Sequence, residues 1–185
     1  MASLRILAPE GTTNYIENPA FRYDTTGWTA VGSAISRTLD EARFNVASLK
    51  VATTGSALYE GAYYRVSKLA GISEAMTGSA YVRGSGRVRI RLVDAGAGKE
   101  WTAEVQLRSD RWQRASVSGF SSGSDDVRLY VETADKIQSV TFYVDGAQIE
   151  RRPYPTTYCD GDQNGCLWNV VEHGSISTRD GSTRD

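Results

Sequence analysis

Apolar and polar residues alternate with a period of two in short segments along most of the chain. In the stretch 87–92, Val88, Ile90 and Leu92 share one side and three arginines share the other. Successive side chains of a β-strand point to opposite faces, so this pattern predicts strands with one buried and one solvated face. The segments predicted as strands are 48–52, 58–66, 78–83, 87–93, 101–107, 111–117, 127–132 and 140–149.

The strands recur at short spacing with Gly, Ser and Asp between them, which predicts an all-β sandwich or barrel over residues 13–150. Residues 1–12 are expected to form an arm, because Pro9-Glu10-Gly11 interrupts the first apolar positions. Residues 151–185 are rich in Pro, Gly, Asp and Ser and are expected to form an extended segment. Such polar segments bury too little apolar surface to order themselves, so packing on neighbouring subunits is the expected source of their order.

Composition excludes several classes of function. The formal net charge is −1, so no basic surface for nucleic acid is predicted. No apolar run approaches the roughly 18 residues that span a membrane, and the first residues lack the apolar segment of a secretory signal. We therefore expect synthesis in a host cytoplasm and no membrane insertion. The one histidine, His173, stands near Ser175 and Ser177, but no oriented carboxylate accompanies them, and we expect no enzymatic activity.

Two segments at opposite ends of the predicted sandwich carry a family resemblance. The first reads Asn18-Pro19-Ala20-Phe21 with Gly27-Trp28 shortly after, and the second reads Phe142-Tyr143-Val144-Asp145-Gly146. With the strands between them, they resemble the jelly-roll carbohydrate-binding modules of galactose-binding-like fold that are appended to glycosidases. The resemblance implies an all-β jelly-roll sandwich. It also implies a structural calcium ion between the opening and closing strands, although Arg22 stands where the family pattern has an acidic residue.

A second resemblance lies in the C-terminal stretch. Tyr158-Cys159-Asp160-Gly161-Asp162, then Gly165-Cys166-Leu167-Trp168 and His173-Gly174-Ser175-Ile176-Ser177, resemble bacteriophage minor tail proteins. This implies a non-enzymatic virion protein of the tail or tail tip that assembles through its termini with other virion proteins or copies of itself. Host surface glycan is a further expected partner. Two alternatives remain open: a capsid decoration or head-fibre protein of the same fold, and a module that targets an enzyme to polysaccharide.

Outward-facing aromatic and polar side chains are the candidates for glycan binding. Sugar-binding proteins stack apolar sugar faces on Trp or Tyr rings and hydrogen-bond the hydroxyl groups through flanking polar groups. The alternatives are a solvated or subunit-covered face, and arginines that are ion-paired with acidic residues on adjacent strands. The candidate glycan-binding residues are Tyr63, Tyr130, Tyr143, Arg89, Arg91, Glu104 and Gln106.

A polar loop near the C-terminus is a candidate for calcium. Asp160, Asp162 and Asn164 match the first half of an EF-hand loop, and Asp145 is the further candidate ligand from the closing strand. Val171 stands where the EF-hand has Glu, so a plain turn capped by Asp and Asn side chains is the alternative.

Cys159 and Cys166 bracket this same loop, and a disulfide between them would close it. Cytoplasmic synthesis favours free or buried thiols, while oxidation in an assembled virion outside the cell would favour the bridge.

Overall fold

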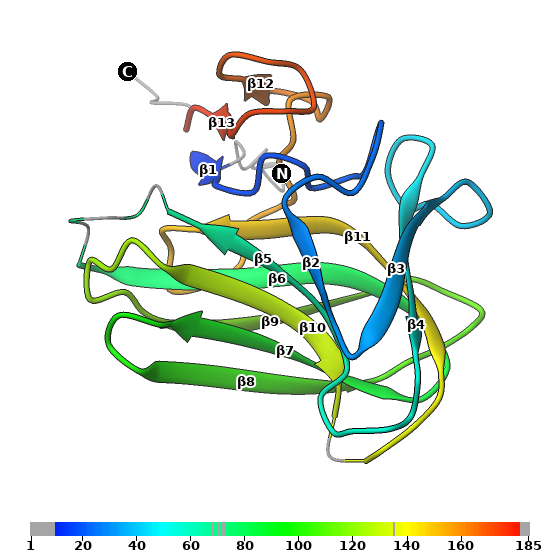
Figure 1. The fold of residues 1–185 in the computed structure, drawn as a ribbon. Helices are drawn as coiled ribbons and strands as arrows, with labels where there is room; N and C mark the ends of the chain where they lie inside the picture. Colours follow the sequence, from blue (N-terminus) through cyan, green and yellow to red (C-terminus); the bar gives the residue numbers. More distant parts are fainter. Residues whose placement is uncertain (1–9, 68, 70, 72, 135, 182–185) are drawn as a thin grey trace, which may run out of the picture.

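The computed structural model describes residues 10–67, 69, 71, 73–134 and 136–181. Within these residues two five-stranded antiparallel sheets pack face to face, and a small three-stranded sheet lies at one side of them (Figure 1). In spatial order, sheet I contains β2 (Trp28–Val31), β5 (Gly61–Val66), β10 (Val127–Thr133), β7 (Arg87–Asp94) and β8 (Lys99–Gln106). Sheet II contains β3 (Ser33–Thr38), β4 (Ser48–Thr53), β11 (Thr141–Glu150), β6 (Ala75–Gly84) and β9 (Gln113–Phe120). The small sheet contains β1 (Thr12–Asn14), β13 (Ser177–Arg179) and β12 (Leu167–Trp168).

The core lies between sheets I and II, where the alternating pattern places it. Val88, Ile90 and Leu92 of β7 are fully buried, as are Phe142 and Val144 of β11. Each such side chain contributes about 1.5–3 kcal/mol when it leaves water, so a one-residue slip in either strand would lose several of these contributions together. The predicted all-β jelly-roll sandwich is confirmed.

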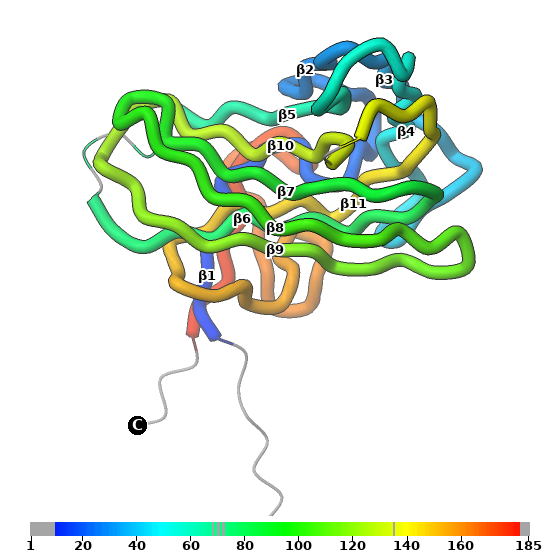
Figure 2. Tube along the Cα trace, turned by 90° about the horizontal axis from the view of Figure 1, so that it is seen from below, coloured from blue at the N-terminus to red at the C-terminus, as the bar shows by residue number. Residues whose placement is uncertain are grey.

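The C-terminal segment folds back on the sandwich instead of extending away from it. Ser177–Arg179 pairs with Thr12–Asn14, so segments from the two ends of the chain lie side by side (Figure 2). This segment also covers the outer side of the last part of β11, and both faces of β11 are buried from Val144 to Glu150. The expectation that neighbouring subunits order the segment is therefore wrong for residues 151–181, since contacts within the chain do so. Residues 1–9 of the expected arm lie outside the described residues.

Cys159 and Cys166 form a disulfide, which is one of the two alternatives that the sequence left open. The loop between them contains two tight turns, with Gln163 N–H donating to the Asp160 carbonyl and Cys166 N–H donating to the Gln163 carbonyl. These turns bring the two cysteines together. Closing a loop of this length stabilises the folded state by about 2–3 kcal/mol in the chain-entropy treatment.

No helix in the described part of the chain is long and apolar enough to cross a membrane.

Candidate functional site

The outer face of sheet I gathers six of the seven predicted glycan-binding residues. Tyr63 of β5 lies directly opposite Tyr130 of β10, and Tyr130 lies opposite Arg91 of β7. Arg89 faces Glu104 of β8 in the same way, and Gln106 ends this strand. Tyr143 lies elsewhere, on β11 of sheet II, beside Lys50 and Arg83. The alternation predicted its outward phase but not the sheet to which the strand belongs.

The aromatic rings of this face stack on one another and on arginine side chains. The Tyr63 and Tyr130 rings are stacked with centroids 4.8 Å apart and planes inclined by 27°, and the Arg91 guanidinium lies 3.9 Å from the Tyr130 ring centroid. Arg89 covers the Tyr59 ring in the same way at 3.6 Å. Tyr130 is therefore only 9% exposed. Its ring is flanked by Tyr63 and Arg91, and Tyr130 occupies one face of the Tyr63 ring.

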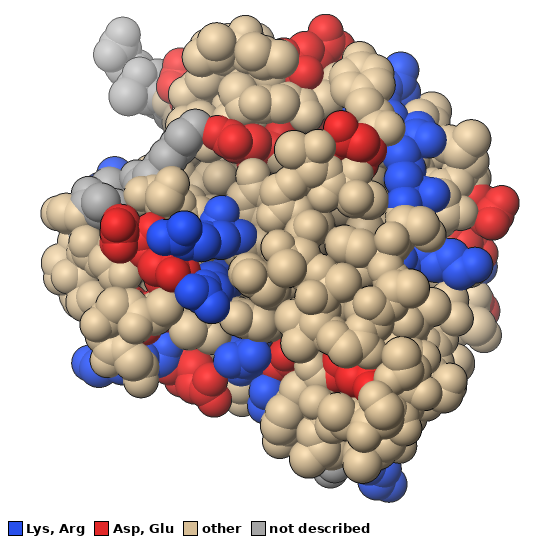
Figure 3. All heavy atoms as spheres, viewed as in Figure 1, with Lys and Arg blue, Asp and Glu red and all other residues tan. Residues whose placement is uncertain are grey.

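Glu132 of β10 is ion-paired with both Arg89 and Arg91. Arg89 Nε and Arg91 Nε each donate to Glu132 Oε1 at 2.7 Å, and the Glu132 side chain is 1% exposed. Burial alone would lower the pKa of Arg91, but the hydrogen bonds and charge of Glu132 and Glu100 raise it. Basic and acidic side chains accordingly lie next to one another on the face seen in Figure 3. The arginines are ion-paired, and glycan binding by this face stays a prediction.

A groove at the end of the sandwich is a second candidate for a binding site. It has a volume of about 290 Å³ and lies between the loop that follows β1 and the turn before β13. This volume is near the lower end of the range for small-molecule sites, about 300 Å³. The groove is lined by Glu17, Asn18, Tyr23, Asp24, Thr26, Tyr64, Val171, Glu172, His173 and Gly174.

Tyr23 is the exposed aromatic residue of this groove. Tyr23 is 67% exposed, and its ring lies edge-on to the His173 ring with the ring centroids 5.5 Å apart. Asp24 is also exposed, and Glu172 lies on the opposite side of the groove. Sequence analysis did not single out Tyr23 or Asp24. The feature of the sequence that could have pointed to them is their position shortly after the Asn18-x-x-Phe21 segment.

The segment 18–28 holds the groove loop in place. Asn18 Nδ2 donates to the carbonyls of Asp24 and Thr26, and Trp28 Nε1 donates to the Asn18 carbonyl. The Trp28 ring packs on the buried Phe21 ring at 5.3 Å. Four contacts of one short segment therefore fix the loop that carries Tyr23, which explains why Asn, Phe and Trp occur together.

The predicted calcium ligands do not converge on one point with open oxygens. Asp160 Oδ1 accepts hydrogen bonds from Asp162 N–H and Gln163 N–H, and Asp160 Oδ2 accepts one from the Tyr158 hydroxyl. Asp145 is also buried and hydrogen-bonded to the backbone, and Asn164 is exposed. The Asp160 side chain thus caps a turn, as the alternative interpretation has it. A calcium ion at these residues stays a prediction.

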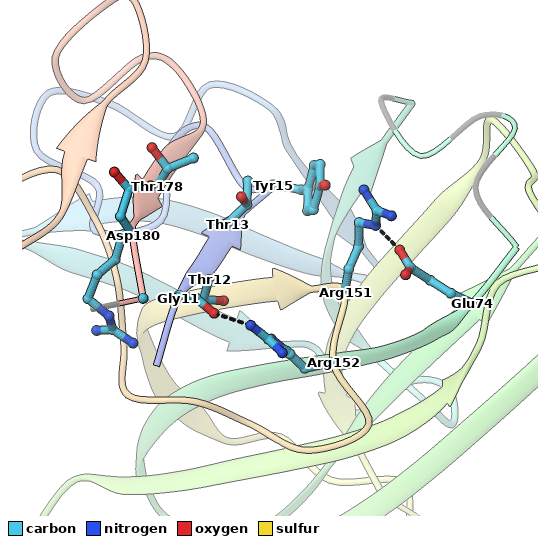
Figure 4. Close-up of a pocket in the computed structure, with 11 residues that line it drawn as sticks. Gly11, Thr12, Thr13, Tyr15, Glu74, Arg151, Arg152, Thr178 and Asp180 are labelled. Carbon is cyan, nitrogen blue, oxygen red and sulfur yellow. Dashed lines mark hydrogen bonds and ion pairs between the residues drawn. The ribbon is translucent and has the colours of Figure 1, made fainter. Parts of the chain in front are cut away.

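A second hollow, of about 400 Å³, lies at the seam between the C-terminal segment and the sandwich (Figure 4). Arg152 Nη2 donates to the Gly11 carbonyl at 2.6 Å, and Arg151 pairs with Glu74 across the hollow. Arg179 Nε donates to the Glu10 carbonyl at 2.9 Å. These charged groups are used to hold the chain ends in place, so this hollow is a weaker candidate than the groove.

The structural comparisons agree on one architecture. The CBM22-1 xylan-binding domain of Paenibacillus barcinonensis Xyn10C matches with a TM-score of 0.60 and 19% identity, over 84% of this chain and 100% of that domain. TmCBM61, solved with β-1,4-galactotriose, matches with a TM-score of 0.57 and 12% identity, over 75% and 99%. The chain has the jelly-roll fold of carbohydrate-binding modules. The predicted resemblance is confirmed at the level of the fold.

The same fold occurs in a phage protein. The enzymatically active domain of tailspike protein 4 from bacteriophage CBA120 matches with a TM-score of 0.59 and 6% identity, over 74% of this chain and 21% of that one. No protein-family profile matches the sequence, and no curated protein matches it significantly.

Proposed function

We propose that this protein is a non-catalytic glycan-binding module and that the groove beside Tyr23 is its binding site. The exposed Tyr23 ring carries the proposal, because an aromatic face that is open to solvent is what a sugar ring stacks on. On the outer face of sheet I, Tyr130 is covered by Tyr63 and Arg91, and Arg89 lies over the Tyr59 ring. The fold that the chain shares with xylan-binding and galactotriose-bound modules supports the same proposal.

The charge of the groove narrows the class of glycan. Glu17, Asp24 and Glu172 line it, and no Lys or Arg of the described chain does. Carboxylates accept hydrogen bonds from sugar hydroxyl groups and repel acidic sugars. The groove is therefore suited to a neutral glycan, and an acidic polysaccharide is disfavoured.

Replacement of Tyr23 tests this assignment. A glycan array on the purified protein first identifies a ligand, and calorimetry then compares the wild type with Tyr23→Ala. Loss of one stacked ring removes about 0.5–1.5 kcal/mol beyond the buried area, so a loss in affinity of about tenfold or more is expected. Tyr154→Ala is the matched control, because Tyr154 is exposed and does not line the groove.

Two different negative results would lead to different conclusions. A wild-type protein that binds no glycan on the array contradicts the function. A wild-type protein that binds, with affinity unchanged in Tyr23→Ala and lost in Tyr63→Ala, places the site on sheet I instead.

A role in a phage virion, as a tail or tail-tip component, is a second proposal. The C-terminal stretch that resembles minor tail proteins supports it, and so does the arrangement of the chain ends. Thr12 pairs with Arg179, so the chain enters and leaves the domain at one edge. This arrangement suits a domain within a longer virion component. The capsid decoration and enzyme-targeting alternatives share the glycan-binding fold and differ in location.

Particle fractionation tests the virion proposal. Phage particles from the source culture are purified, separated into heads and tails, and analysed with an antibody to this protein. Sedimentation with tails is the expected result. Recovery with heads would favour the capsid alternative, and a protein that stays with secreted enzymes in the supernatant would overturn a virion role.

A further inference from the structure

Three potential metal ligands meet at the mouth of the groove. His173 Nε2 lies 3.4 Å from Asp162 Oδ2 and 3.4 Å from Glu172 Oε1. One ligand atom from each residue lies within 4.8 Å of the others, and this is the one such group of three or more within the described residues. Asp162 comes from the disulfide-closed loop, while Glu172 and His173 come from the turn before β13.

The His173 ring is buried, and its Nε2 atom contacts two carboxylates at 3.4 Å. Its side chain is 5% exposed, with the Trp168 ring edge-on at 5.1 Å and the Tyr23 ring edge-on at 5.5 Å. Hydrogen bonds to a ring nitrogen are typically about 2.7–3.2 Å long, and neither carboxylate contact of His173 reaches that range. The imidazole therefore faces two carboxylates from a largely buried position.

The spacing matches a bound transition-metal ion. Nitrogen and oxygen ligands bind zinc at about 2.0–2.2 Å, so two ligand atoms of a tetrahedral site lie about 3.4 Å apart. His173 is separated from each of its partners by this distance. Imidazole is a ligand for zinc-like ions rather than for calcium. The two carboxylates of the group also carry a negative charge that a divalent cation neutralises.

We infer that Asp162, Glu172 and His173 bind a divalent transition-metal ion of the zinc class. Water completes a tetrahedral site as the fourth ligand. Glu172 is 71% exposed at its side chain, which leaves it room to turn toward the ion. Cys159 and Cys166 are not ligands, because they are bonded to each other. The ion would join the two turns of the C-terminal segment, and this inference holds whether or not the groove binds glycan.

Metal titration of the tag-free protein tests this inference. After treatment with a chelator, the protein is titrated with Zn²⁺ by calorimetry and with Co²⁺ by visible absorption. One ion per chain and the intense absorption of tetrahedral cobalt are expected. Asp162→Asn and His173→Asn are each expected to lower the affinity at least tenfold, since even loss of a residue behind the ligands costs about 10–100-fold. Asn is chosen at His173 because it tolerates the positive φ of this residue.

Glu104→Gln is the control, since Glu104 is an exposed carboxylate on β8 outside the group of three. Its affinity should equal that of the wild type. Absence of binding at millimolar zinc would overturn the inference, and so would equal affinity of the wild type, Asp162→Asn and His173→Asn. Circular dichroism of each variant shows whether a loss of binding reflects a loss of fold.

Discussion

Replacement of Asn14 by Ala is expected to lower the free energy of unfolding by about 3–5 kcal/mol. Asn14 is fully buried and makes four hydrogen bonds. Its Nδ2 donates to the carbonyls of Ala147 and Cys159, and its Oδ1 accepts from the N–H groups of Ile16 and Ile149. One side chain therefore joins β1 to β11 and to the C-terminal segment.

The size of the effect follows from what the substitution leaves behind. Alanine removes both ends of the amide, so buried backbone groups on three segments lose a partner at once. Each buried group left without a hydrogen bond costs about 1–3 kcal/mol. The Cys159 carbonyl keeps a hydrogen bond from Ser177 Oγ, which limits the loss at this one position.

Chemical denaturation measures the change, with Asn169→Ala as the matched control. Asn169 is exposed and makes one side-chain hydrogen bond, to Thr178, so a change within about 0.5 kcal/mol is expected there. Asn14→Asp should destabilise at least as much as Asn14→Ala, because a carboxylate oxygen would face two carbonyl oxygens. A loss below 1 kcal/mol in both Asn14 variants would contradict the role assigned to this residue.

The sequence was sufficient to predict the sandwich because its strands are half-buried. Val88, Ile90 and Leu92 alternate with arginines, and this regular alternation corresponds to an inner and an outer face. The pattern fails at residues 28–38, where β2 and β3 were not predicted. Gly32, with φ of 58°, connects these two strands, and the chain passes there from sheet I to sheet II. β2 has four residues, and the six residues of β3 include one large apolar side chain, Ile35, so neither strand carries a clear alternation of apolar and polar residues.

The C-terminal segment was misjudged for a different reason. Its polar groups form hydrogen bonds with polar side chains of β11. Gln148 and Glu150 are fully buried, with Gln148 Oε1 accepting from Cys159 N–H and Glu150 Oε2 accepting from the Thr156 hydroxyl. A low apolar content predicts disorder only when polar groups lack partners. These partners lie in β11, and only the folded chain shows the pairing.

The candidate site was predictable only in part for the same reason. The alternation predicted that Tyr63, Tyr130 and Arg91 face outward, and they lie together because their strands are neighbours in one sheet. It did not show that Arg91, paired with Glu132, lies over the Tyr130 ring. The groove needs Tyr23 and His173 to meet, and this contact exists because β1 pairs with β13. No local pattern records such a contact between the two ends of a chain.

The pH dependence of stability should reveal Asp145, the fully buried acidic residue of the closing strand. Burial raises the pKa of its carboxyl from 3.8 to about 7, and the nearby Asp160 adds to the rise. Hydrogen bonds from the backbone N–H groups of Phe44, Arg43 and Gly146 act in the opposite direction. The protonated form is therefore favoured in the folded protein relative to the unfolded chain.

The sign of the effect follows from linkage between protonation and folding. Between pH 4 and pH 7 the unfolded chain has lost the Asp145 proton and the folded protein still holds it. The contribution of Asp145 to stability is therefore largest below pH 4, falls as the pH rises to 7 and is constant above that value. A shift from 3.8 to about 7 corresponds to a change of up to about 4 kcal/mol.

A comparison of the wild type with Asp145→Asn isolates this contribution, because asparagine does not ionise. Other carboxyl groups, such as Asp94 and Asp126, have lowered pKa values and lose stability as the pH falls, but both proteins share them. The unfolding free energy of the wild type minus that of the variant should decrease between pH 4 and pH 7 and then level off. A difference that is flat, or that grows with pH, would show that the three backbone N–H groups keep the carboxylate ionised. NMR titration of the Asp145 carboxyl carbon would locate the pKa directly.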